Sequence, residues 1–138
     1  MNFIIKHKWL YYLISATWGF IMTFIGCAVS LVLLIFRQKP YKFGNGWYFK
    51  IGNNWGGLDL GVCFICGNGS DTHHLKCHEA GHGIQNITFG PLFPFLIAIP
   101  SAIRYHYRNI KKPTTKYDDI WFEGQATKLG VKYYGNCK

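Results

Sequence analysis

The sequence predicts an α+β protein in which an N-terminal transmembrane helix precedes one small folded domain. Residues 9–36 contain no charged side chain. Residues 41–66 combine aromatic and β-branched residues with glycines, a pattern typical of a β-hairpin. Two later segments carry the polar caps and terminal glycines typical of helices. The first begins near Thr72 and ends at Gly90, and the second begins at Ile120 and is closed by Gly130. At 138 residues the chain fits one domain and leaves no room for a second sizeable core.

The uncharged run makes residues 9–36 a candidate transmembrane helix. These 28 residues would form a helix of about 42 Å, whereas the hydrocarbon core of a bilayer is ~30 Å thick. Trp9 suits one membrane interface, and Arg37 ends the run at the other. We therefore divide the chain into residues 1–40, a basic head with a transmembrane helix, and residues 41–138, a metal-binding domain. Two basic residues precede the run and thirteen follow it, so the positive-inside rule predicts that the domain is cytoplasmic.

A second apolar stretch covers residues 89–103. It has about 15 residues and three prolines, which is short for a spanning helix. We expect an interfacial or re-entrant membrane segment here, with a short tilted span as the alternative. The basic and aromatic residues that follow it, 104–112, suit a lipid headgroup region.

Charge and cysteine content narrow the class of protein further. Fifteen basic residues against six acidic ones give a formal net charge of +9, which favours attraction to a membrane surface. The basic residues are scattered rather than clustered, so no nucleic-acid partner is expected. Five cysteines form an odd set without regular spacing, unlike the framework of a disulfide-stapled secreted domain.

The predicted hairpin pairs residues 47–51 with residues 58–65 through a glycine- and asparagine-rich turn. Its second strand lies just upstream of the helix that starts near Thr72. An exposed strand edge in that position could bind an extended peptide by adding it to the sheet, although ordinary sheet packing explains the same pattern.

The most informative motif is His78-Glu79-Ala80-Gly81-His82. Residues four apart on a helix share one face, so His78 and His82 can direct their imidazole nitrogens at one metal ion. Glu79 lies beside them, in the position of a general base for a metal-bound water. Ala80 and Gly81 are small, which allows another backbone or a substrate to approach the site closely.

Glu123 is the candidate third ligand. It follows three large apolar residues, 120–122, so we expect it to face packed structure, where a carboxylate is costly unless it is paired or binds a metal. It is also the only glutamate besides Glu79. The alternative is a surface glutamate at a helix N-terminus. Two histidines and a glutamate leave the fourth position of a tetrahedral Zn²⁺ ion open for water, so we predict Zn²⁺ as the cofactor.

Other residues compete for roles at this site. Cys63-x-x-Cys66, with Cys77 and His78, could form a structural zinc site, but residues three apart on a strand face opposite sides. His73 and His74 suit exposed positions at the start of the helix. An electrophilic group that assists the transition state could come from any of five side chains. These are Arg104, Tyr105, His106, Tyr107 and Tyr117.

The His78-Glu79-x-x-His82 motif with the downstream Glu123 is similar to the gluzincin pattern of zinc metallopeptidases. More closely, the segments NWGGLDLG (ending at Gly61), HEAGHGIQNITFGPLFPFLIAIPSAIRY (78–105) and YDDIWFEGQATKLG (117–130) resemble a family of small bacterial membrane proteins with this motif order. The resemblance implies a minimal zincin-like core over roughly residues 45–130. Gluzincins often carry an aspartate four residues after the ligand glutamate; Thr127 stands there, so we expect different support for the histidines, from Asp118, Asp119 or a backbone carbonyl.

Site-2 proteases share the His-Glu-x-x-His motif, but their Leu-Asp-Gly ligand follows it. Here Leu58-Asp59 precedes it, so this match is excluded.

Together these observations predict a membrane-anchored zinc metallopeptidase that hydrolyses peptide bonds, with Glu79 as general base. The expected partners are a peptide or protein substrate and the lipid bilayer. A domain this small also favours a cleft completed by a partner chain or by a second copy, as in a homo-oligomer. Two alternatives remain open: a non-catalytic zinc-binding membrane protein that serves as an interaction module, and a membrane-surface binder in which the motif is incidental.

Overall fold

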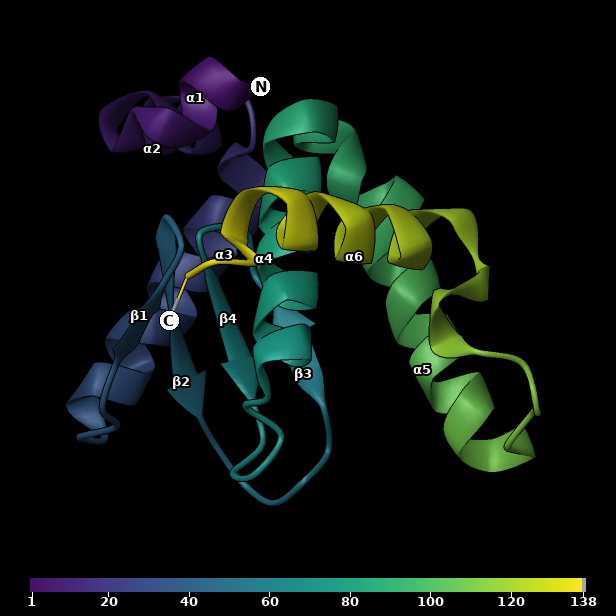
Figure 1. The fold of residues 1–138 in the computed structure, drawn as a ribbon. Helices are drawn as coiled ribbons and strands as arrows, with labels where there is room; N and C mark the ends of the chain where they lie inside the picture. The colour runs from purple at the N-terminus through teal and green to yellow at the C-terminus, as the bar shows by residue number, and fades with distance from the viewer. Residues whose placement is uncertain (138) are drawn as a thin grey trace.

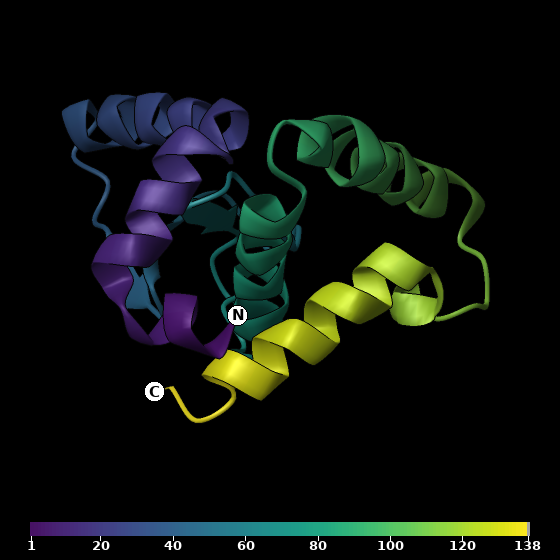
Figure 2. The ribbon, with the colours of Figure 1, turned by 90° about the horizontal axis from the view of Figure 1, so that it is seen from above.

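The computed structural model describes residues 1–137, which form an α+β fold in which helices lie on both faces of a small sheet (Figure 1). The predicted α+β class is confirmed. The helices are α1 (Asn2–Lys6), α2 (Lys8–Thr17), α3 (Phe20–Ile35), α4 (His73–Phe89), α5 (Ile99–Lys111) and α6 (Trp121–Tyr134). The strands are β1 (Tyr41–Phe43), β2 (Gly46–Lys50), β3 (Gly57–Asp59) and β4 (Cys63–Cys66). Seen from above, α3 lies on one side, α4 lies in the middle, and α6 crosses α4 on the far side (Figure 2).

The sheet has the order β1-β2-β4-β3, and its central pair, β2 and β4, is parallel. The predicted single hairpin is therefore wrong. Residues 58–65 do not form one strand, because the chain reverses between β3 and β4 at Gly61, which has a φ of +84°. The Asp59 carboxylate accepts a hydrogen bond from the Gly61 amide at 3.1 Å and closes this turn. As a result β3 pairs with β4 in the antiparallel sense and forms one edge of the sheet.

The predicted continuous helix over residues 9–36 is also wrong, because the chain bends by 104° between α2 and α3. The break lies at Trp18 and Gly19, and contacts with α4 hold it. The Asn86 side chain donates to the Gly19 carbonyl at 3.3 Å, and a Cβ atom on Gly19 would come within 2.6 Å of the same amide. The Trp18 ring fills the space beside Gly90, where any side chain would overlap it. The bend thus depends on tertiary contacts that the local sequence does not reveal.

Helix α3 packs along the sheet through its inner side. A Cβ atom at Gly26 would overlap the Leu60 carbonyl, so only glycine allows this approach. Further along, the Trp47 indole donates to the Ser30 hydroxyl at 3.0 Å, and Ser30 donates to the Cys63 sulfur at 3.3 Å. These contacts fasten α3 to the face of the sheet opposite α4.

Helices α4 and α6 cross at two glycines. A Cβ atom at Gly81 would overlap the Ala126 carbonyl, and one at Gly130 would overlap the Cys77 carbonyl. Such close crossings bring the backbones together without intervening side chains. The prediction that Gly130 ends the last helix is therefore wrong: α6 continues to Tyr134, and Gly130 is the point of contact between the helices.

Residues 90–111 are helical throughout, in a 3₁₀ turn η1 (Gly90–Leu92), a π-helical turn η2 (Pro94–Ala98) and α5. The α4–η1 segment and the η2–α5 segment meet at a bend of 117°. Within residues 1–137 no single helix is both long and apolar enough to cross a bilayer, although the α2/α3 pair and this pair each reach the required length and hydropathy together.

Candidate metal centre

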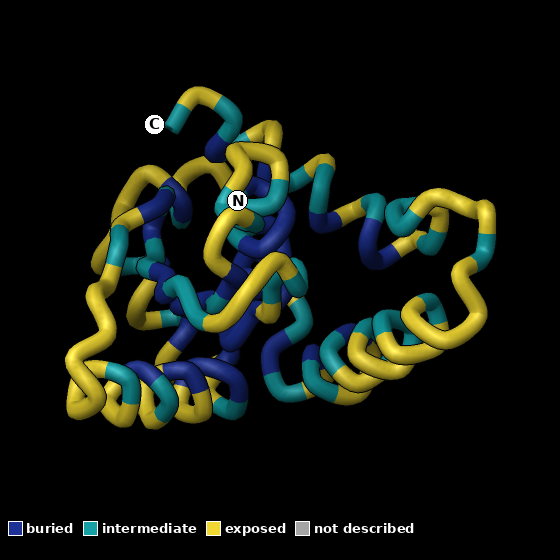
Figure 3. Tube along the Cα trace, turned by 90° about the horizontal axis from the view of Figure 1, so that it is seen from below, coloured by how far each residue is buried: buried dark blue, intermediate teal, exposed yellow. Residues whose placement is uncertain are grey.

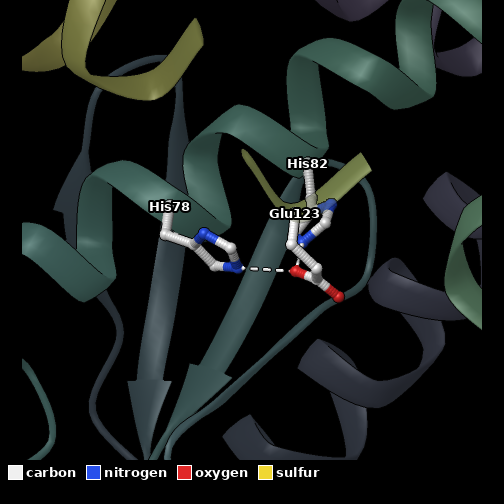
Figure 4. Close-up of side chains that lie close together, drawn as sticks. All are labelled: His78, His82 and Glu123. Carbon is white, nitrogen blue, oxygen red and sulfur yellow. Dashed lines mark hydrogen bonds and ion pairs between the residues drawn. The ribbon is translucent and has the colours of Figure 1, made fainter. Parts of the chain in front are cut away.

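Helix α4 brings His78 and His82 together on one side, as their spacing predicts (Figure 4). The helix begins at its cap, Thr72, whose hydroxyl accepts a hydrogen bond from the Leu75 amide at 3.2 Å. The imidazole rings lie 4.8 Å apart between centroids and are nearly perpendicular. Both histidines are buried, and both also line a cleft.

Glu123 lies between the two rings. Its side chain is 0% exposed, and one carboxylate oxygen, Oε2, is 3.1 Å from His78 Nε2 and 3.2 Å from His82 Nε2. The other oxygen, Oε1, accepts a hydrogen bond from the Ser101 hydroxyl of α5. The helix crossing at Gly81 places Glu123 here, because it lies one turn before Ala126 on α6. The prediction that Glu123 is buried is confirmed.

The hydrogen bonds of Gln85 determine the tautomer of His82, that is, which of its ring nitrogens carries the hydrogen. Gln85 donates from Nε2 to the Phe122 carbonyl and to the Gln125 side chain, both at 2.9 Å. Its oxygen therefore points at His82 Nδ1, 2.7 Å away. An amide oxygen accepts and does not donate, so His82 Nδ1 carries the hydrogen. The lone pair of a neutral His82 then lies on Nε2, directed at the Glu123 carboxylate.

The same logic applies to His78. Thr127 donates to the Asp118 carboxylate at 2.9 Å, so its oxygen is free to accept from His78 Nδ1 at 2.8 Å. The lone pair of a neutral His78 therefore also lies on Nε2. The sequence predicted that Asp118, Asp119 or a carbonyl supports the histidines. The structure assigns this role to Asp118 through Thr127, while Asp119 accepts from the Lys116 amide instead.

Three electron-pair donors thus converge on one point, which favours a cation between them. Two ligands each about 2.0–2.1 Å from a tetrahedral zinc ion lie about 3.3–3.4 Å apart, close to the observed separations from Glu123. All three ligand atoms lie within 4.8 Å of one another, and within residues 1–137 they are the one group of three or more such residues with this geometry. The buried His78, His82 and Glu123 can therefore hold a metal ion.

Glu123 and His78 shift each other's pKa values. Burial by itself would raise the pKa of Glu123, but its contacts with His78 and His82 outweigh burial and hold the pKa below its ordinary value. Conversely, burial would lower the pKa of His78, and its contact with Glu123 raises it overall. Glu123 is thus an anion at neutral pH, which suits a metal ligand.

Glu79 lies beside the cluster and lines a cleft of about 860 Å³. Edge strand β3 and the inner side of α5 form its walls. A side chain on Gly57 of β3 would meet the Glu79 carboxylate, so the strand edge passes directly against it. Burial raises the pKa of Glu79, with His78 and His82 acting in the opposite direction. Asp59, also on β3, lines the same cleft, and burial followed by the nearby Glu79 charge raises its pKa well above the usual range.

The five candidate electrophilic residues separate in the structure. Tyr117 lies closest to the cluster: its ring is 6.1 Å from that of His78, and burial raises the pKa of its phenol to about 12, with Ser101 and Glu123 also acting on it. Tyr105 lines the cleft but donates to the Trp55 carbonyl at 2.7 Å. His106 also lines the cleft. Arg104 donates to the carbonyls of residues 116 and 117, and Tyr107 is exposed on the outer side of α5.

The alternative zinc site on the cysteines does not form. Cys63 bonds Ser30 and the Gly26 carbonyl on the α3 side of the sheet, whereas Cys66 and Cys77 belong to the core on the α4 side. Burial raises the pKa of the Cys66 thiol to about 11. His73 is exposed and bonds the Gly135 carbonyl.

Sequence reasoning missed three residues of the site: Gln85, Ser101 and Asp59. Gln85 lies three residues after His82, on the same side of α4, so the helical period could have suggested it. Ser101 and Asp59 reach the site through the bend before α5 and the turn at Gly61, for which the sequence holds no comparable signal.

Comparisons of the chain with protein-family models, with curated proteins and with solved structures found no match. The resemblance to gluzincins and to the small bacterial membrane proteins stays a prediction.

Proposed function

We propose that this protein is a zinc-dependent peptidase whose metal ion is held by His78, His82 and Glu123. The observation that carries the proposal is that the ligand atoms of His78, His82 and Glu123 converge beside a cleft that Glu79 also lines. A structural zinc site is closed by four protein ligands, whereas a catalytic site keeps one position open. Three ligands next to an open cleft support the catalytic type. The donor set, two imidazoles and one carboxylate, suits zinc.

When bound, Zn²⁺ supplies a Lewis acid that polarises a carbonyl and lowers the pKa of a water toward ~7. The chain's own residues do the rest. Glu79 accepts the proton of the attacking water, and it can pass this proton to the leaving amine. Its raised pKa brings it closer to neutrality, which suits a group that both accepts and donates.

Tyr117 is the side chain best placed to stabilise the oxyanion that forms on the substrate carbonyl. It lines the cleft, and its ring lies 6.1 Å from that of His78. Its phenol stays protonated at neutral pH, because burial raises the pKa to about 12. It can therefore donate a hydrogen bond as charge develops.

The edge strand β3 supports an extended peptide as the substrate. A strand at the edge of a sheet has unpaired backbone groups that can pair with an added strand. Gly57 brings that edge against Glu79, so a peptide paired with β3 would pass beside the metal ligands.

The test compares native protein with Glu79→Gln, a variant that keeps the size of the side chain but cannot accept a proton. Both are loaded with zinc and incubated with a tryptic digest of a bacterial lysate, and new peptide termini are identified by mass spectrometry. We expect new termini with the native protein and a rate at least about a hundredfold lower with Glu79→Gln, at equal zinc content.

His82→Ala serves as the control that should lose both zinc and activity. Zinc bound without new termini, or equal cleavage by Glu79→Gln, would contradict the proposal and favour a non-catalytic zinc-binding module.

A further inference from the structure

Helix α3 and the η2–α5 segment are far apart in the sequence, and both expose apolar side chains along one side of the molecule. We call this surface the α3–α5 face. On each segment, exposed positions recur every three or four residues. All the main members named below except Ile99 are more than 60% exposed. Its main members are Phe24, Leu31, Ile35, Phe95, Ile99, Ile103 and Ile110.

Both parts of the face lie on the same side of α4, opposite α6 (Figures 1 and 2). Helix α3 contacts η1, so the two parts join where the chain leaves α4. Seen from below, exposed positions follow the outer edge of α3 and of α5, and buried positions follow the inner side of α3 (Figure 3). The apolar groups therefore form one continuous side of the protein rather than isolated patches.

The inner sides of these helices are already occupied. Gly26 and Ser30 fasten α3 to the sheet, and Ile97 and Ser101 turn toward the cleft and Glu123. The α3–α5 face is thus what remains after the protein has packed its own core. Large contiguous apolar surfaces that stay exposed mark interaction sites with proteins or membranes.

The charges around the face identify its partner. Residues 1–58 contain six basic side chains and residues 80–117 contain five, and neither segment contains an acidic one. Arg37 and Lys39 follow the end of α3, and Lys111 and Lys112 follow the end of the exposed stripe on α5. Bulky apolar groups bordered by cations complement a bilayer, whose acyl chains meet the first and whose anionic headgroups meet the second.

We propose that the α3–α5 face binds the protein to one leaflet of an anionic bilayer, with α3 and α5 lying in the plane of the membrane. Two hydrogen bonds and the close contact at Gly26 hold α3 against the sheet, and the proposed arrangement keeps α3 there rather than across the bilayer. Both ends of residues 9–36 then stay on the same side of the membrane. This arrangement replaces the spanning helix that the sequence predicts.

Binding to one leaflet would also restrict where a substrate can lie, a consequence that rests on the proposed peptidase function. Helix α5 has its outer side in the leaflet and its inner side in the cleft, and a helix with its side chains is about 10–12 Å wide. The metal ligands would therefore lie about one helix width from the lipid surface. The substrates would be extended peptide segments that lie at that surface.

The first experiment is flotation of the full chain with vesicles of phosphatidylcholine, with or without phosphatidylglycerol. We expect binding that increases with phosphatidylglycerol. Ile103→Glu should lower the partition coefficient about tenfold, because one large apolar side chain no longer enters the leaflet. The matched control is Val131→Glu on α6, which is 52% exposed against 64% for Ile103 and lies off the face. No flotation, or an equal loss with Val131→Glu, would overturn the proposal.

The second experiment distinguishes binding in the plane of one leaflet from a helix that crosses the bilayer. Asn2→Cys and Gln38→Cys are made in a Cys27→Ser, Cys137→Ser background and added to preformed vesicles. A membrane-impermeant maleimide should label both positions without detergent. Labelling of one position only, until detergent is added, would show that residues 9–36 cross the bilayer. A lipid-independent dimer that ignores vesicles would assign the face to a second copy instead.

Neither experiment depends on catalysis. Flotation is repeated with Glu79→Gln and with chelator, and we expect the same partition as for the native protein. The membrane-binding proposal can therefore be correct if the peptidase proposal fails, and the peptidase proposal can be correct if the protein does not bind vesicles.

Discussion

The α4–α6 crossing and the α3–α5 face place polar and apolar groups in opposite ways. At the crossing, His78, His82, Gln85 and Glu123 are buried together, where ordinary cores hold apolar side chains. On the face, residues such as Phe24 and Ile103 lie in the open. Each arrangement is costly for the isolated chain. Each becomes favourable with an external partner: a metal ion between the buried acceptors, and a bilayer against the exposed apolar groups.

The largest effect is expected from breaking the crossing itself. Gly81→Val would force α4 and α6 apart, because its side chain would overlap the Ala126 carbonyl. We expect a loss of more than about 4 kcal/mol in the free energy of unfolding, the range of severe overpacking with backbone shifts, together with loss of metal binding. Chemical denaturation monitored by circular dichroism measures the change. Lys128→Ala, an exposed position on α6, should remain near native stability; similar stabilities for both variants would mean that the helices do not cross here.

Removing the ion should destabilise the crossing but leave the face unchanged. A ligand present at about 100 times its Kd stabilises a protein by about 2.7 kcal/mol. Chelation should therefore lower the Tm of the native protein and of Glu79→Gln equally, because Glu79 is not a ligand, and should leave Glu123→Ala unchanged. Calorimetry in the presence and absence of chelator checks this. An equal shift in Glu123→Ala would place the ion elsewhere.

A smaller effect is expected from the group that orients His82. Gln85→Leu leaves the His82 Nδ1 hydrogen without an acceptor, so zinc affinity should fall about 10- to 100-fold. Gln125→Ala is the matched control, since it removes a hydrogen bond to Gln85 but not the contact with His82. Competition with a fluorescent zinc chelator measures both affinities. Equal affinity in Gln85→Leu and native protein would contradict the assigned orientation of His82.

The parts of this comparison that the sequence predicted are the ones set by local pattern. His78 and His82 share a face because the helical period requires it, and Glu123 was placed in the interior by the apolar residues before it. Helix α4 begins after its N-cap Thr72 and ends at its C-cap Gly90, as the two residue types predict. The bend at Gly19 and the parallel pairing of β2 with β4 were not predicted. They depend on contacts with Asn86 and on the turn at Gly61, which arise only when distant segments pack.

The smallest effect on stability is expected on the face. Ile103→Glu should change the free energy of unfolding by no more than about 0.5 kcal/mol, because the side chain contacts little of the folded protein. Urea denaturation without lipid provides the value. A loss of several kcal/mol would mean that the α3–α5 face belongs to an internal core, and the contrast with the crossing would disappear.

The most direct test of the metal centre is the zinc content of the purified full chain after repletion, measured by inductively coupled plasma mass spectrometry. The native protein is compared with Glu79→Gln and Glu123→Ala. The geometry predicts about one zinc per chain in the native protein and in Glu79→Gln, and none in Glu123→Ala. Zinc retained by Glu123→Ala, or absent from the native protein, would contradict the assignment of His78, His82 and Glu123 as the metal ligands.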